Sequence, residues 1–175
     1  MQARKIKYDV IGLTETRRHH PLNATFETGE ELFLGTCDSR GVGGVGVLVN
    51  TSLAMNIDSF EQLTTRIGRL RISRCGSIPA LTVFIAYAPT SSYDEDELEE
   101  FYMDLEKFYR EDHTFYKIIV GDFNAKIGEG RLRNFTLESI IYSGKNKERE
   151  VGVQVLPRQP PSAAASRQSW HLRRG

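Results

Sequence analysis

Close to its start the chain carries the stretch Tyr8-Asp9-Val10-Ile11-Gly12-Leu13-Thr14-Glu15-Thr16, a short apolar run that ends in polar residues. An apolar run of this length predicts a strand that is buried on both faces. Glu15 is then placed at the carboxyl end of the strand, and such ends often carry the binding sites of α/β proteins. The stretch therefore predicts a buried sheet with a polar group at its edge.

The chain up to about residue 130 has the pattern of a sheet-rich α/β domain, in which Gly-rich and polar connections separate further apolar runs. One connection, Gly41–Gly46, is rich in glycine, but it leads into a strand and lacks the helix and the Lys-Ser/Thr pair of a phosphate-binding loop. We interpret it as a turn. The runs that predict further strands are Glu31–Gly35, Val45–Asn50, Arg69–Ser73, Leu81–Ala88 and Tyr116–Gly121.

A helix is predicted after Ser92, because Ser92 can cap its first turn and Glu95 completes a capping box. An apolar face then recurs at three- and four-residue spacing, which is typical of a helix that packs on a core. His113 follows the expected end of the helix, where a positive charge is favourable, so we give it a structural role. The residues of the apolar face are Leu98, Phe101, Tyr102, Leu105, Phe108 and Tyr109.

The composition is that of an ordinary soluble protein. At 175 residues the chain is long enough for one domain with its own core and short for two. The two cysteines, Cys37 and Cys75, form no CxxC motif, so neither a disulfide framework nor a zinc site is expected. No apolar run approaches the roughly 18–20 residues of a membrane helix, and the start lacks the apolar segment of a signal peptide. We expect an intracellular protein, and the sequence is compatible with the nucleus.

The net charge of zero hides an uneven distribution. Residues 131–175 contain nine Lys/Arg and three Asp/Glu, which leaves 14 Lys/Arg and 20 Asp/Glu in residues 1–130. The folded part therefore lacks the strong basic face that is typical of duplex-binding proteins. Residues 131–175 also contain Pro157, Pro160 and Pro161 and show no apolar period, which predicts a basic, disordered tail after a domain of residues 1–130.

Three segments place polar side chains directly after an apolar run. These side chains are Glu15, Tyr87 and the pair Asp122 and Asn124. Asp122 and Asn124 are two positions apart, so in an extended backbone both leave the same face while Phe123 points the other way. Carboxylates with retained waters are the usual way to hold Mg²⁺ against a phosphate. Each residue alone has an alternative role in a turn or a cap, but together they predict a metal and phosphate site.

The segments that carry these residues resemble, in order, three motifs of the endonuclease/exonuclease/phosphatase superfamily. They resemble in particular the endonuclease domain of RTE-like non-LTR retrotransposon reverse transcriptases. The resemblance covers roughly residues 4–130. The three segments are Asp9-Val10-Ile11-Gly12-Leu13-Thr14-Glu15-Thr16-Arg17, Tyr87-Ala88-Pro89-Thr90-Ser91 and Gly121-Asp122-Phe123-Asn124-Ala125-Lys126.

The resemblance implies an α/β four-layer sandwich that cuts DNA by metal-assisted attack of water on a phosphodiester. By motif, Glu15 is the ligand of a magnesium ion and Tyr87 contacts the phosphate. Asp122 orients or deprotonates the attacking water, and Asn124 binds a phosphate oxygen or the scissile oxygen. Metal and hydrogen-bond donors then stabilise negative charge on the phosphoryl oxygens, usually the largest catalytic effect.

The chain departs from this family pattern at two places. The family begins with a strand that carries an Asn near the metal, and this chain starts at what resembles the end of the following helix. The family also ends with an Asp-His pair, whereas Asp112-His113 is the only such pair here and precedes Asp122. We therefore expect an incomplete sandwich without its first and last strands, a remnant with little or no activity. An active endonuclease and a phosphatase or phosphodiesterase of the same superfamily are the alternatives.

Overall fold

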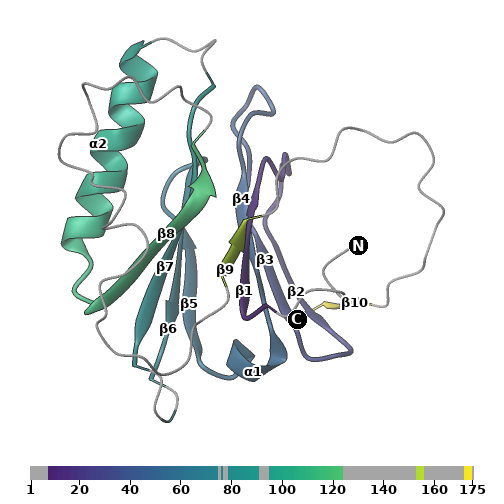
Figure 1. Ribbon diagram of the computed structural model, residues 1–175. Helices are drawn as coiled ribbons and strands as arrows, with labels where there is room; N and C mark the ends of the chain where they lie inside the picture. The colour runs from purple at the N-terminus through teal and green to yellow at the C-terminus, as the bar shows by residue number, and fades with distance from the viewer. Residues whose placement is uncertain are drawn as a thin grey trace.

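Two β-sheets face one another, and the long helix α2 packs on the outer face of one of them (Figure 1). The computed structural model describes residues 8–74, 76, 79–90, 95–123, 153–155 and 172–174, the last two ranges as backbone only. Within these ranges no helix is long and apolar enough to cross a membrane.

The first sheet has the strand order β10-β2-β3-β4-β1-β9. Strand β1 is antiparallel to β4, with Val10 opposite Val49, and it is parallel to β9. The predicted strand before Glu15 therefore lies inside this sheet with a partner on each side. The strands are β1 (Val10–Thr14), β2 (Leu22–Phe26), β3 (Glu31–Leu34), β4 (Val45–Val49), β9 (Val153–Val155) and β10 (Leu172–Arg174).

The second sheet has the strand order β5-β6-β7-β8, formed by β5 (Ile57–Gln62), β6 (Ile67–Ile72), β7 (Leu81–Tyr87) and β8 (Tyr116–Asp122). The short helix α1 (Thr51–Ala54), capped by the Asn50 side chain, lies between β4 and β5 in the chain. Strands β7 and β8 are parallel, and α2 (Glu95–Glu111) connects them, as parallel neighbours require. Their register places Tyr87 directly opposite Asp122 at the carboxyl ends of both strands.

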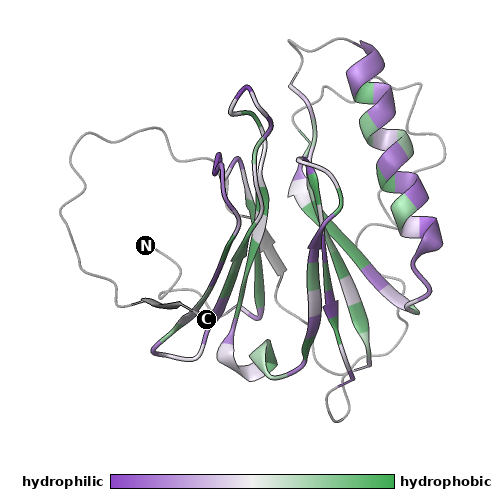
Figure 2. Cartoon of the chain, turned by 180° about the vertical axis from the view of Figure 1, so that it is seen from behind, coloured by the Kyte–Doolittle hydropathy of each residue, from purple (hydrophilic) through white to green (hydrophobic). Residues whose placement is uncertain are grey.

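Strand β7 is buried along its whole length and separates two parts of the core. Because successive side chains point to opposite faces, Val83 and Ile85 pack between the two sheets, whereas Phe84 packs against α2. Phe101 and Leu105 are the buried residues of the helix. Figure 2 shows apolar residues concentrated along the strands, while α2 mixes apolar and polar residues along its length. Each fully buried aliphatic side chain contributes about 1.5–3 kcal/mol to folding.

The predicted strands and the predicted helix are present, and no end differs from the prediction by more than three residues. Strands β2 and β5 were not predicted, because their mixed apolar and polar residues are only partly buried and give no clear period. The turn at Gly41 is confirmed: the Asp38 carboxylate accepts hydrogen bonds from the Arg40 and Val42 amides. The predicted cap residue, Ser92, lies outside the described residues.

The described residues form three layers, namely the two sheets and helix α2. This is a mixed α/β arrangement made mostly of strands, whereas a fourth layer and the lack of first and last strands remain predictions. Residues 131–175, which we expected to be disordered, contribute the short strands β9 and β10 and otherwise lie outside the described part. The domain boundary at residue 130 also remains a prediction. Cys37 is buried and free, and Cys75 lies outside the described residues.

Candidate functional site

Glu15 follows the last residue of β1 and turns the chain away from the sheet. Its φ angle is 53°, in the left-handed region that residues other than glycine rarely adopt. Arg17 has a similar φ of 50°. The Glu15 side chain is 16% exposed, and its Oε2 lies 3.3 Å from Nη2 of Arg17. The carboxylate therefore lies just beyond the carboxyl end of β1, in an unusual backbone turn that surrounding contacts must maintain.

Tyr87 ends β7 in the second sheet, and its hydroxyl donates a hydrogen bond to Oε1 of Glu15. This hydrogen bond connects the two sheets. Burial, the hydrogen bond to Glu15 and the charge of that carboxylate raise the pKa of Tyr87 to about 12. The phenol therefore keeps its proton at neutral pH, and it acts as a hydrogen-bond donor in the site.

Asp122 ends β8 beside Tyr87. The Ala88 amide donates a hydrogen bond to the Asp122 carbonyl, at 2.9 Å, so the pairing of the two strands continues to the last residue. The negative charge of Asp122 also contributes to the raised pKa of Tyr87. Three of the four predicted site residues, Glu15, Tyr87 and Asp122, are thus brought together at one edge of the molecule. The fourth, Asn124, lies outside the described residues, and its role stays a prediction.

Two arginines stand beside these residues. Arg17 forms the ion pair with Glu15, and the guanidinium carbon of Arg66 lies 5.3 Å from the centroid of the Tyr87 ring. Arg17 belongs to the first motif and could have been singled out from its position. Arg66 could not, because it lies in the connection between β5 and β6, and β5 itself gave no clear sequence pattern. Their positive charges make this edge suitable for a phosphate group.

The Asp112-His113 pair lies at the opposite end of the second sheet. Leu81 pairs with Tyr116 at that end, six positions before Tyr87 pairs with Asp122, and six residues of strand span about 20 Å. The dipeptide is therefore far from the edge that carries Glu15, Tyr87 and Asp122.

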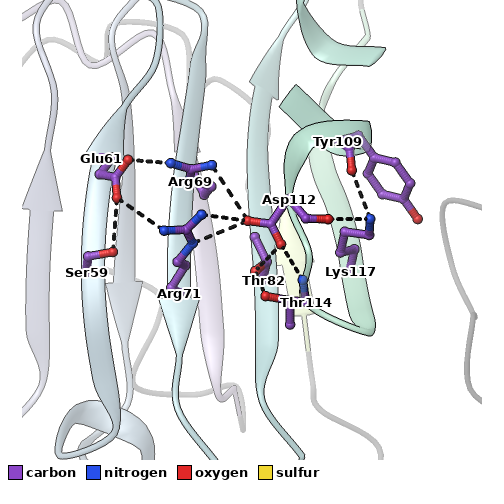
Figure 3. Close-up of polar contacts among 9 residues, drawn as sticks. All are labelled: Ser59, Glu61, Arg69, Arg71, Thr82, Tyr109, Asp112, Thr114 and Lys117. Carbon is purple, nitrogen blue, oxygen red and sulfur yellow. Dashed lines mark hydrogen bonds and ion pairs between the residues drawn. The ribbon is translucent and has the colours of Figure 1, made fainter. Parts of the chain in front are cut away.

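Asp112 is 2% exposed and serves as the centre of a structural network (Figure 3). One carboxylate oxygen accepts hydrogen bonds from Arg71, and the other accepts them from the Thr82 hydroxyl and the Thr114 amide. His113 is exposed, two residues after the end of α2, in the position that the sequence predicted. Its neighbour Asp112 therefore has a structural role, because its hydrogen bonds connect the end of α2 to β6 and β7 of the second sheet.

The donor set at the candidate site fits a hard divalent cation. Glu15 and Asp122 offer carboxylate oxygens close to Tyr87, and one or two carboxylates completed by water suit magnesium. Within the described ranges, no group of three or more His, Cys, Asp or Glu side chains is arranged to hold a metal.

The sequence profile of the endonuclease/exonuclease/phosphatase family matches residues 2–173. The matched range contains all four predicted site residues and extends beyond residue 130. No curated protein matches the chain.

Proposed function

Because the chain belongs to the endonuclease/exonuclease/phosphatase family, we propose that it is a remnant of a magnesium-dependent DNA endonuclease, of the kind found in RTE-like retrotransposons. In the proposed reaction the oxygen of water bonds to phosphorus while the bond from phosphorus to one deoxyribose oxygen breaks, and the leaving oxygen takes a proton from the solvent. The proposed turnover is low. The observation that carries this proposal is the meeting of Glu15, Tyr87 and Asp122, which come from both sheets and two parallel strand ends, around one hydrogen bond.

In this proposal Glu15 would hold the metal, and magnesium bound there would supply positive charge that offsets the negative charge on the phosphoryl oxygens. The chain's own residues do the rest. Tyr87 keeps its proton because its pKa is raised to about 12. Its hydroxyl, which donates to Glu15 in this structure, would donate to a phosphoryl oxygen instead when the substrate is bound. The Asp122 carboxylate accepts a hydrogen bond from the attacking water and takes its proton. Arg17 adds a positive charge beside the phosphate.

Low turnover is proposed because Asp112-His113, the only Asp-His pair in the sequence, is engaged elsewhere. Asp112 is buried among Arg71, Thr82 and Thr114, about 20 Å from the site along β7. A positioned acid or base contributes roughly 10²–10⁴ in rate, and an electrostatic donor about 10²–10³ more. A site without the Asp-His pair of the family pattern retains Glu15, Tyr87 and Asp122 but cuts slowly. A fully active endonuclease is the alternative.

DNA is preferred over small phosphate esters as the substrate because the Thr90-Ser91 and Phe123-Asn124-Ala125-Lys126 segments are similar to those of retrotransposon endonucleases. A phosphatase or phosphodiesterase of the same family is the weaker alternative. The retrotransposon origin further implies that remnants of reverse-transcriptase coding sequence flank the gene, which sequencing of the locus tests.

The activity is tested by nicking of supercoiled plasmid in the presence of Mg²⁺. We expect slow nicking by the unaltered protein, and less by Asp122→Ala and Glu15→Gln. Equal nicking by the unaltered protein and the two variants would rule out catalysis by this site. Nicking at the rate of an ordinary endonuclease would instead establish the active alternative. Hydrolysis of a small phosphate ester in preference to intact or abasic DNA would favour the phosphatase.

A further inference from the structure

The glycine-rich connection before β4 lies directly beside the candidate site. The Thr16 amide donates to the Gly44 carbonyl at 3.0 Å, and the Arg17 amide donates to the Gly43 carbonyl at 3.2 Å. These two amides belong to the residues that follow Glu15. The glycine pair Gly43-Gly44 therefore accepts two backbone hydrogen bonds from the turn at Glu15.

The same glycine pair also reaches the second sheet. The Gly44 amide donates to the Thr65 carbonyl, at 2.8 Å, in the connection between β5 and β6. The next residue, Arg66, accepts a hydrogen bond from the Tyr87 amide, also at 2.8 Å. A continuous series of backbone contacts thus runs from the Glu15 turn through Gly44 to the strand that ends in Tyr87.

Only glycine fits at these two positions. Gly43 and Gly44 both have a φ of 84°, where any L side chain is strained. A Cβ atom on Gly44 would lie 2.3 Å from Oγ1 of Thr16, and one on Gly43 would lie 2.7 Å from the Thr65 carbonyl oxygen. Gly41 has a comparable φ of 75°, but a Cβ atom there would meet nothing within 4 Å. The close approach therefore distinguishes Gly43 and Gly44 from Gly41 in the same connection.

The Glu15 turn depends on such support. Its φ of 53° and that of Arg17, 50°, are unfavourable for residues with a side chain, so the segment needs fixed contacts to keep this shape. Its side chain must meet a phenol from the other sheet. An error of about 1 Å in that meeting is enough to lower catalysis substantially.

We propose that Gly43 and Gly44 are positioning residues, which fix the Glu15 carboxylate against Tyr87 by joining the Glu15 turn to the second sheet. The inference rests on the proposed function for its importance to metal binding, because it assumes that Glu15 holds the cation. The hydrogen-bond contacts themselves do not depend on that assumption.

The test compares Gly44→Ala with Gly41→Ala, which introduces the same side chain at a similar φ without the close contact. Binding of Mn²⁺ is measured by electron paramagnetic resonance of the free ion. Supporting contacts around a metal ligand typically change affinity 10–100-fold, so Gly44→Ala is expected to weaken Mn²⁺ binding at least about tenfold. Gly41→Ala should leave it unchanged.

A second measurement needs no metal. Hydrogen exchange of the Thr16 and Arg17 amides is expected to rise about tenfold in Gly44→Ala and to stay unchanged in Gly41→Ala. The Val47 and Val49 amides of β4 report whether the sheet itself is intact. Equal exchange of Thr16 and Arg17 in the two variants would overturn the inference. Faster exchange throughout β4 in Gly44→Ala would also overturn it, since the glycine would then serve the whole sheet.

Two further variants keep the test decisive if Gly44→Ala folds poorly. Gly43→Ala acts on the other contact, at the Thr65 carbonyl, and should have the same local effect. Thr16→Ala removes the oxygen that a Cβ atom on Gly44 would meet. The variant that combines Gly44→Ala with Thr16→Ala should therefore recover part of the Mn²⁺ affinity that Gly44→Ala loses. If the unaltered protein and Glu15→Gln bind Mn²⁺ equally, the proposed metal site fails, while amide exchange still decides the positioning inference.

Discussion

Replacing Asp112 should destabilise the protein because its buried carboxylate joins three elements. The Arg71 guanidinium donates to it from β6 at 3.0 and 3.2 Å, the Thr82 hydroxyl donates from β7 at 3.1 Å, and the Thr114 amide donates at 3.0 Å from the segment after α2. Thr82 is fully buried, and without Asp112 its hydroxyl would rely on the Thr114 hydroxyl, 2.9 Å away.

Removing one partner of a buried ion pair costs about 3–5 kcal/mol. The Arg71 side chain is 36% exposed and also lies near Glu61, so its charge is partly compensated without Asp112. We therefore expect Asp112→Ala to lower the free energy of unfolding by about 3 kcal/mol, the lower end of that range. Asp112→Asn keeps the shape and part of the hydrogen bonding, so its expected loss is about 1.5–3 kcal/mol.

The assay is urea unfolding at several pH values. Burial alone would raise the pKa of Asp112, but hydrogen bonds from Thr114, Arg71 and Thr82 outweigh it and lower the pKa. A lowered pKa contributes stability above the unfolded-state value, about 3.9, and this contribution is lost as the pH falls through the folded-state pKa. The difference between the unaltered protein and Asp112→Asn should therefore be largest near neutral pH and shrink below about pH 4.

His113→Ala is the matched control, because His113 is the exposed neighbour in the same dipeptide. It should change neither stability nor nicking of plasmid. The reasoning is refuted if Asp112→Ala unfolds at the same urea concentration as the unaltered protein. A loss of nicking by folded His113→Ala would also refute it, since the dipeptide would then take part in the reaction.

Two further predictions concern the site and the core. Tyr87→Phe keeps the ring but removes the hydroxyl that Glu15 accepts, so plasmid nicking should fall about 10²–10³-fold with the circular dichroism spectrum unchanged; equal nicking would exclude a role for the phenol. Leu105→Ala opens a cavity between α2 and the second sheet and should cost about 2–5 kcal/mol in urea unfolding, because Leu105 is 1% exposed. Met103→Ala on the same helix is the control, since Met103 is 65% exposed and its loss should cost less than about 0.5 kcal/mol.

The sequence predicts elements whose residues are uniformly buried or strongly periodic. Strand β7 is buried at every position, and α2 has one apolar face, so both give clear patterns. Strand β2, in contrast, has one buried residue, Ala24, among partly exposed ones, and its apolar residues do not alternate regularly. Its place in the sheet is set by pairing with β3, a contact between segments that local patterns do not encode.

At the candidate site, too, the residues with a clear local sequence pattern were predicted and those placed by contacts between distant segments were not. Glu15, Tyr87 and Asp122 were predicted because each follows an apolar run, and the motifs that contain them resemble a known family. Arg66 was missed, because its role depends on the path of the chain between two strands. Gly44 was interpreted only as part of a turn, since nothing in the local sequence shows that Thr16 and Thr65 meet there.

The two ends of the second sheet have different roles, one in stability and one at the candidate site, so substitutions at the two ends should have different effects. At one end Asp112 connects α2 to the sheet, so changes there should alter the free energy of unfolding without moving the site. At the other end Tyr87 and Asp122 have a fixed spacing as opposed residues of parallel strands. Glu15 follows β1 of the first sheet, so its distance from Tyr87 and Asp122 depends on how the two sheets pack.

The core sets the distance between the two sheets, and the backbone contacts through Gly44 fix the position of the Glu15 turn within that arrangement. Substitutions at Gly43 or Gly44 should therefore impair the site while lowering the free energy of unfolding less than substitutions in the core do.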